Sequence, residues 1–176
     1  MIVKNFRYSR ESLDLKQKDL TNFFNVTPST ISGWEIGKDT IPLKHLIKYA
    51  NEYSLSLDYL FGLKNENEIY KPLSIDLKSI GKNLRIIRKQ NNLTQEEVAK
   101  ILNTSASGYA HYENARNLIP TTFLYGLSKV YRNFSVDEIL GRKKWKLLTS
   151  YINLLYKRKV SIFQMRLFSI VIIIYV

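Results

Sequence analysis

Four polar or charged positions of this sequence recur after a constant interval of 78 residues. The matched pairs are Arg10 and Arg88, Gln17 and Gln95, Glu35 and Glu113, and Lys38 and Arg116. Amide, guanidinium, ammonium and carboxylate groups form hydrogen bonds and ion pairs. The chemistry that this pattern predicts is therefore binding.

The residue types that catalysis or metal binding would need do not cluster. The two histidines, His45 and His111, lie in different copies of the repeat, without a carboxylate cluster, a glycine-rich phosphate loop or a nucleophile motif beside them. No cysteine occurs, which excludes thiolate metal sites and favours a reducing, cytoplasmic setting. We therefore predict that the protein is not an enzyme and has no metal or cofactor site.

The recurring residues belong to a duplicated helical unit. Residues 15–42 align with residues 93–120 without a gap. Apolar residues at helical spacing, separated by turn residues, predict five short helices in each copy. The expected helices are 5–12, one from Gln17, 28–36, 43–53 and 57–61 in the first copy, and 80–91, one from Gln95, 106–114, 121–131 and 136–140 in the second.

Both copies resemble the helix-turn-helix domain of the phage-repressor and Cro-like (XRE) family. The second copy carries the family pattern at Leu84, Arg85, Arg88, Leu93, Thr94, Gln95, Ala99, Tyr112, Glu113 and Arg116. The first carries it at Phe6, Arg7, Arg10, Leu15, Gln17, Leu20, Ile31, Trp34, Glu35, Gly37 and Lys38. The resemblance implies an all-α fold with two lambda-repressor-like five-helix domains in tandem, at 1–63 and 80–141. A polar linker (64–79) would join them, and a basic amphipathic and apolar extension (142–176) would follow.

The resemblance also implies which residues contact DNA. In this family the third helix lies in the major groove, and the first residue of the second helix binds a phosphate. The implied phosphate contacts are Gln17, Lys38, Gln95 and Arg116. The implied base-facing residues are Pro28, Ser29, Ser32 and Gly33 in the first copy, and Ala106, Ser107, Ala110 and His111 in the second. Structural ion pairs are expected between Arg10 and Glu35 and between Arg88 and Glu113.

The implied base-facing residues are weak determinants of sequence specificity. Strong discrimination usually comes from Arg or Lys on guanine, or from Asn or Gln on adenine, and none of these types occupies the face. This composition indicates either modest specificity that depends on DNA shape and avidity, or one copy that has ceased to bind. At the turn before the third helix, Asn25 and Asn103 replace the usual glycine, and Asn tolerates positive φ best after glycine.

The positive charge of the chain is unevenly distributed. Residues 1–70 contain nine basic and nine acidic residues, residues 71–141 contain ten and six, and residues 142–176 contain eight and none. Charge alone would therefore not identify the first copy as a DNA-binding domain. The linker is long enough, at up to about 55 Å when extended, to let one molecule touch two half-sites about 34 Å apart.

The C-terminal extension leaves several interpretations open. Residues 142–159 could form a helix that packs on the second domain or on a homodimer partner, a basic arm on DNA, or a membrane-surface helix. Residues 160–176 are apolar but interrupted by Gln164 and Arg166, so a membrane contact competes with pairing of the β-branched run 170–174 with another chain.

Two functional hypotheses follow from these patterns. The first is a sequence-specific transcriptional regulator, a repressor, that binds two half-sites of double-stranded DNA and is associated with the nucleoid. The alternative is an interaction or scaffold protein that uses its helix-turn-helix domains for protein contacts, with the tail as a membrane or oligomerisation segment.

Overall fold

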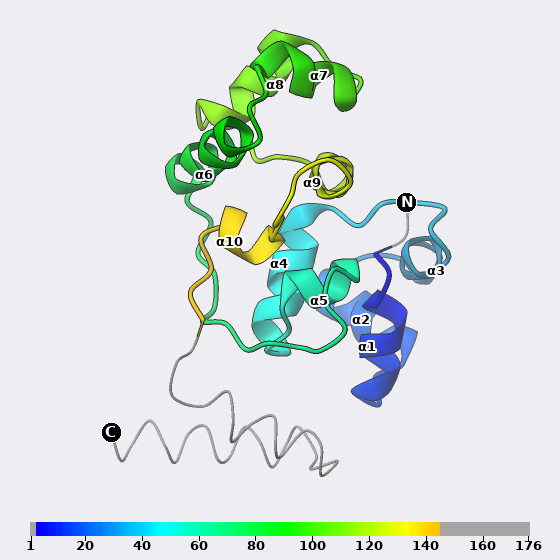
Figure 1. The fold of residues 1–176 in the computed structure, drawn as a ribbon. Coiled ribbons are helices and arrows are strands. Elements are labelled where there is room, and N and C mark those ends of the chain that lie inside the picture. Colours follow the sequence, from blue (N-terminus) through cyan, green and yellow to red (C-terminus); the bar gives the residue numbers. More distant parts are fainter. Residues whose placement is uncertain (1–2, 145–176) are drawn as a thin grey trace. The chain divides into compact units, whose positions relative to one another are not determined.

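The computed structural model describes residues 3–144, which contain ten α-helices (Figure 1). The first copy contains α1 (Phe6–Ser12), α2 (Gln17–Phe24), α3 (Pro28–Ile36), α4 (Leu43–Glu52) and α5 (Leu57–Phe61). The second contains α6 (Leu77–Gln90), α7 (Gln95–Ile101), α8 (Ala106–Glu113), α9 (Thr121–Ser128) and α10 (Val136–Ile139). The prediction of an all-α fold with two five-helix copies is therefore confirmed.

Side-chain caps explain where several of these helices begin. Thr27, Thr94 and Ser105 accept hydrogen bonds from backbone N–H groups in the first turns of α3, α7 and α8. Helix α6 begins at Leu77, within the segment predicted as linker, because the Asp76 side chain accepts from Lys78 N at 3.0 Å. The linker is correspondingly shorter than expected.

The turn between the second and third helix has the predicted conformation in both copies. Asn25 has φ 54° and Asn103 has φ 51°, so both lie in the left-handed region. Asparagine adopts this conformation more readily than other non-glycine residues because its short polar side chain bonds locally. Helices α3 and α8 therefore both follow a turn with a left-handed asparagine.

Each copy encloses a small apolar core. In the first, the fully buried Phe6 and Tyr49 rings meet edge to face at 5.1 Å, and Trp34 packs on Phe24 at 5.6 Å. In the second, the fully buried ring is that of Tyr109. The other buried apolar residues of the second core include Ile80, Leu84, Val98, Leu124 and Leu127.

The two copies dock through a reciprocal exchange of helix caps between α5 and α10. The Asp58 carboxylate accepts from Val136 N at 2.6 Å and from the Ser135 hydroxyl at 2.7 Å. The Asp137 carboxylate accepts from Leu57 N at 3.1 Å and from Asp58 N at 2.8 Å. Each aspartate thus binds the N-terminus of the helix in the other copy, where backbone N–H groups favour an anion.

Arg142 completes this interface, although the sequence places it in the C-terminal extension. Its guanidinium, of which only 1% of the side-chain surface is exposed, donates to Asp137 at 3.0 Å and to the Leu55 carbonyl at 2.9 Å. It also lies over the ring of Tyr70, 5.4 Å from the centroid. The described residues up to Lys143 therefore pack as one unit.

The segment between the copies differs from the extended polar linker that the sequence suggests. Ile69 and Tyr70 are buried, and the Asn51 side chain forms two hydrogen bonds with the backbone of Leu73, at 2.8 and 2.9 Å. Lys71 N also donates to the Lys143 carbonyl at 3.0 Å. The linker therefore packs against the helices, because its apolar side chains are buried and its backbone groups form hydrogen bonds there.

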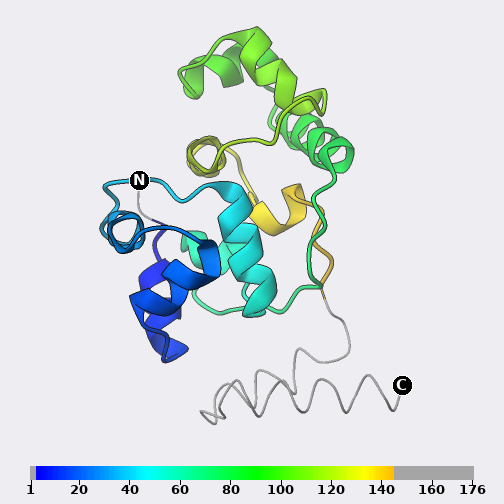
Figure 2. The same cartoon turned by 180° about the vertical axis from the view of Figure 1, so that it is seen from behind.

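Helices α4, α5, α9 and α10 lie between α1–α3 and α6–α8 in both views (Figures 1 and 2). Within residues 3–144, no helix has the length and apolarity needed to span a lipid bilayer. The predictions for the tail, including a homodimer contact and membrane contact by residues 160–176, concern residues 145–176 and lie outside the described residues.

Candidate nucleic-acid interface

Helix α3 buries one face and exposes the other. Ile31 is fully buried and Trp34 nearly so, while Pro28 and Ser29 are exposed and Ser32 is half-buried. The Thr27 side chain accepts from Thr30 N at 3.3 Å and fixes the start of the helix beside Pro28. The first turn of α3 is therefore open to a partner.

Gly33 does not present its own surface to a partner, which corrects the expectation that it faces bases directly. It is buried, because the loop after α3 folds back until Asp39 N donates to the Gly33 carbonyl at 3.1 Å. A Cβ atom built on Gly33 would lie 2.6 Å from Asp39 Oδ2. The Asp39 carboxylate therefore covers this position.

Helix α8 exposes the corresponding face in the second copy. Ser107 is exposed, and Ala106, Ala110 and His111 are half-buried. A groove of about 580 Å³ runs between this face and the start of α7. The groove brings together four predicted DNA contacts, Gln95, Ala106, Ser107 and Ala110.

The structure contains both ion pairs expected between the first and third helix of a copy. Arg88 donates to the two carboxylate oxygens of Glu113 at 2.6 and 3.0 Å, and Arg10 pairs with Glu35 in the same bidentate way. The side chains of Glu35 and Glu113 are 2% and 0% exposed. Each pair therefore ties the recognition helix to the first helix of its copy.

Gln17 and Gln95 have a partner that sequence reasoning missed. The amide nitrogen of Gln17 donates to Glu35 Oε2 at 2.8 Å, and that of Gln95 donates to Glu113 Oε2 at 2.8 Å. The interval of 18 residues between glutamine and glutamate is the same in both copies, which was the available signal. Each copy thus holds an Arg–Glu–Gln cluster at the start of its second helix.

Ionisation of the glutamate in the second cluster is favoured. Burial alone would raise the pKa of Glu113, but hydrogen bonds from Arg88 and Gln95 outweigh it and lower the pKa. The hydrogen bond to Glu113 likewise raises the pKa of Arg88. The cluster is therefore a charged, fully hydrogen-bonded unit at neutral pH.

Lys38 and Arg116 lie in the loop after the recognition helix and are both exposed. The residue before each has positive φ, 77° at Gly37 and 58° at Ala115. Ala115 is strained there, because its Cβ atom approaches the backbone in the left-handed region.

Replacing Ala115 with glycine should raise the free energy of unfolding by about 0.5–1 kcal/mol, since relief of this strain exceeds the extra chain entropy. The matched change Gly37→Ala should lower it by about 1–2 kcal/mol. Urea denaturation of the two variants measures both effects. A loss of stability in Ala115→Gly would contradict the expectation.

The histidines differ in their surroundings. His45 is half-buried against Phe24 and Trp34, with ring centroids 5.1 and 5.5 Å away, and burial, assisted by the charge of Lys48, lowers its pKa. His45 therefore contributes to the core. His111 lies in the last turn of α8 and is half-buried.

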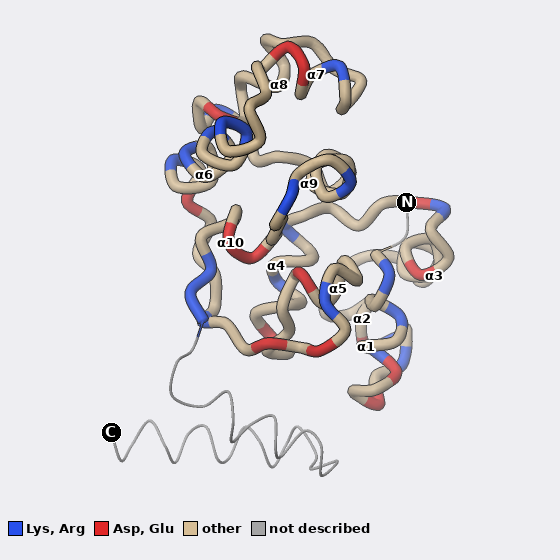
Figure 3. The backbone as a smooth tube through the Cα atoms, viewed as in Figure 1, with Lys and Arg blue, Asp and Glu red and all other residues tan. Residues whose placement is uncertain are grey.

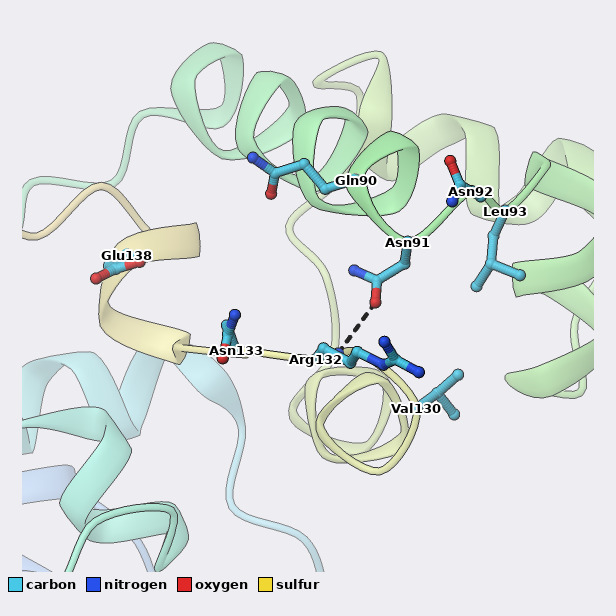
Figure 4. Close-up of a pocket in the computed structure, with 8 residues that line it drawn as sticks. All are labelled: Gln90, Asn91, Asn92, Leu93, Val130, Arg132, Asn133 and Glu138. Carbon is cyan, nitrogen blue, oxygen red and sulfur yellow. Dashed lines mark hydrogen bonds between the residues drawn. The ribbon is translucent and has the colours of Figure 1, made fainter.

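A second recess, of about 760 Å³, lies beside the turn between α6 and α7 (Figure 4). Asn91 Oδ1 accepts there from Arg132 N at 3.0 Å, and Glu138 is the single carboxylate of the lining. Among residues 3–144, no group of three or more His, Cys, Asp or Glu side chains is arranged to hold a metal ion.

The second copy carries more net positive charge than the first, because it contains fewer acidic residues. Helix α6 contains five lysines and arginines and no acidic residue (Figure 3). The first copy is electrically balanced, as its sequence indicates. An electrostatic attraction to phosphate would therefore be stronger at the second copy.

Comparisons with known proteins agree with this geometry. The family model described as helix-turn-helix matches the chain twice, over residues 6–60 and 84–139. The chain is also similar to antitoxin PezA of Streptococcus pneumoniae serotype 4 (strain ATCC BAA-334 / TIGR4), with 34% identity over 65 residues. That alignment spans 37% of this chain and 40% of the antitoxin, so less than half of the relative is covered. No solved structure matches.

Proposed function

Since this chain belongs to the XRE-type helix-turn-helix family, we propose that it represses transcription by binding two unlike half-sites in duplex DNA. The observation that carries the proposal is the exposed first turn of α3 and of α8, each tied to its domain by an Arg–Glu–Gln cluster. In this arrangement Ser29 and Ser107 enter the major groove.

Gln17 and Gln95 are proposed as phosphate contacts. A primary amide has two N–H donors, so each glutamine can donate one to its buried glutamate and the other to a phosphate oxygen. The glutamate then orients the amide before DNA arrives, which reduces the entropy lost on binding. Lys38 and Arg116 add charge at the other end of each recognition helix.

The cap exchange between α5 and α10 supports the proposal of two half-sites. Helix-turn-helix proteins commonly bind as symmetric dimers whose spacing sets the half-site separation. Here the two copies are covalently joined and docked, so one chain would supply both recognition helices. Because the copies differ in sequence, the half-sites would differ too.

Selection of bound sequences from a random duplex pool tests the proposal directly. We expect enrichment of two unlike elements at a fixed spacing and an affinity that falls as salt rises. The double change Gln17→Ala and Gln95→Ala should abolish measurable binding. Binding that is unaffected by salt and by this double change would refute the proposal.

A second double variant separates phosphate contact from folding. Lys38→Ala with Arg116→Ala should reduce the slope of log K against log salt by about 2, because each lost phosphate contact removes about 0.9. Both side chains are exposed, so stability should be unchanged. The charge-matched control is Lys71→Ala with Lys89→Ala, which should leave the slope nearer to that of the unaltered chain.

The name of the antitoxin relative favours a second candidate, the binding of a partner protein. This corresponds to the interaction or scaffold hypothesis. Comparing the full chain with a truncation after Lys143 distinguishes the two functions. Retention of a protein partner by the full chain alone, with no DNA binding by either form, would favour the second candidate.

A further inference from the structure

Gly33 lies on the outward face of α3 although it is buried. Residues of an α-helix are rotated by about 100° from one to the next, so Gly33 points about 200° away from the fully buried Ile31. Its neighbour on that face, Ser29, is exposed. What covers Gly33 therefore lies on the surface that the recognition helix presents.

The cover is the carboxylate of Asp39. It occupies the place where a side chain of residue 33 would begin, since a Cβ atom there would be 2.6 Å from Asp39 Oδ2. Asp39 itself is exposed. The loop thus delivers an anionic acceptor to this face of α3, into space that a side chain at position 33 would otherwise share.

The second copy has a different group at the same place. Gly33 aligns with His111 and Asp39 aligns with Asn117, and Asn117 N again donates to the carbonyl of residue 111, at 3.4 Å. The loop therefore follows a similar path, but the recognition surface carries an imidazole and an amide in place of a carboxylate. The copies therefore differ at a position on the face that is proposed to contact bases.

We propose that the Asp39 carboxylate contacts a base in the first half-site and accepts a hydrogen bond from N4 of cytosine. A carboxylate is an acceptor only, so it repels the O6 and N7 acceptors of guanine and the O4 acceptor of thymine. Adenine offers its N6 amino group beside the N7 acceptor, whereas cytosine presents the amino donor without a neighbouring acceptor. The inference rests on the proposed DNA-binding function.

The test measures base preference at each position of the selected duplex. For the unaltered chain, replacing the preferred cytosine should weaken binding roughly 5- to 150-fold. Asp39→Asn should lose the preference for cytosine at that position and keep the preferences of the second half-site. The matched control, Asn117→Asp, should alter only the second half-site.

A second variant removes the carboxylate from the surface without changing its charge. Gly33→Ala places a methyl group where Oδ2 lies, so Asp39 must move. It should lose the cytosine preference as Asp39→Asn does. A thermal melt checks that both variants are folded.

Unchanged base preferences in both variants would overturn the inference, including the case in which Asp39→Asn binds every sequence more tightly because the carboxylate merely repels DNA. Absence of salt-dependent duplex binding by the unaltered chain would overturn the proposed function and this inference with it. The two failures are therefore distinguishable.

Discussion

Replacing Arg142 with methionine should lower the free energy of unfolding by about 3–5 kcal/mol at pH 7.5. Methionine fills much of the same volume but leaves the buried Asp137 carboxylate without its counter-charge and the Leu55 carbonyl without a donor. A buried charge that has lost its partner is far more costly than the pair is favourable. Urea denaturation of the unaltered and substituted chains measures the loss.

The loss should depend on pH in a defined direction. Burial raises the pKa of Asp137 to about 6, against the opposing effect of Arg142. A raised carboxyl pKa means that the folded state holds the proton more tightly than the unfolded state, so this group's contribution to stability decreases as pH rises toward 6. Without Arg142 the pKa moves higher still, and the variant should recover stability as pH falls from 7.5 to 5.

The cation beside the other aspartate of the interface supplies a control. On the other side of the interface, Lys64 Nζ lies 3.8 Å from Asp58, and the lysine side chain is 38% exposed. Lys64→Met should therefore cost about 1 kcal/mol or less. Equal losses from the two substitutions, or no loss from Arg142→Met at either pH, would show that burial of Arg142 does not stabilise the docking of the copies.

The helices and their order could be predicted from the sequence because the signals are local. Thr27 before Pro28, Thr94 before Glu97, and Asn25 and Asn103 at the turns each act within a few residues. Apolar residues at helical spacing in the same way mark the buried face of α6, which includes Ile80 and Leu84. These helix starts and turns depend on local backbone preferences, which do not require contacts with distant parts of the chain.

The docking of the copies could not be predicted in this way. Asp58 and Asp137 occupy equivalent positions, each two residues after a capping serine, and from sequence each would be assigned to its own helix. Only the tertiary arrangement sends each carboxylate to the helix of the other copy. The length of the linker limits the distance that it can span between the copies. It does not indicate whether the linker residues pack against the helices.

The candidate site could be predicted only in part, because some of its contacts join residues that are far apart in the sequence. The Arg–Glu pairs follow from the family pattern, but the sequence did not show that the amide of each glutamine, expected to contact DNA, also donates to a glutamate 18 residues away. The Asp39 carboxylate on Gly33 was also missed, although a glycine on the outer face of a helix is an unfavourable choice that signals a close approach.

Replacing Glu113 with glutamine should lower the free energy of unfolding by about 3–5 kcal/mol at pH 7. The change keeps the shape of the side chain but leaves the buried guanidinium of Arg88, 11% exposed, without its counter-charge. Arg85 Nε, 3.5 Å from Glu113 Oε2, then adds a second cation to the same place. The hydrogen bond that orients Gln95 is weakened in the same step.

The equivalent change in the first copy should be milder. In Glu35→Gln, Arg10 keeps an ion pair with Glu11, whose Oε1 lies 3.2 Å from Arg10 Nη2. Glu11 therefore still partly neutralises the charge of Arg10, and the loss of stability should be clearly smaller than that of Glu113→Gln. Urea denaturation at pH 7 gives the order of the two, and the reverse order would contradict the assignment of Glu11 as the reserve partner.

The pH dependence of Glu113→Gln has the sign opposite to that expected at Asp137. Because hydrogen bonds lower the pKa of Glu113 despite its burial, its contribution to stability is complete above the ordinary glutamate value of about 4.3 and is lost as pH falls through the lower folded-state pKa. The unaltered chain should therefore lose its advantage over the variant in acid. A difference in unfolding free energy that stayed constant from pH 7 to pH 3 would mean that the charge of Glu113 contributes nothing, and that the cluster holds the recognition helix by shape alone.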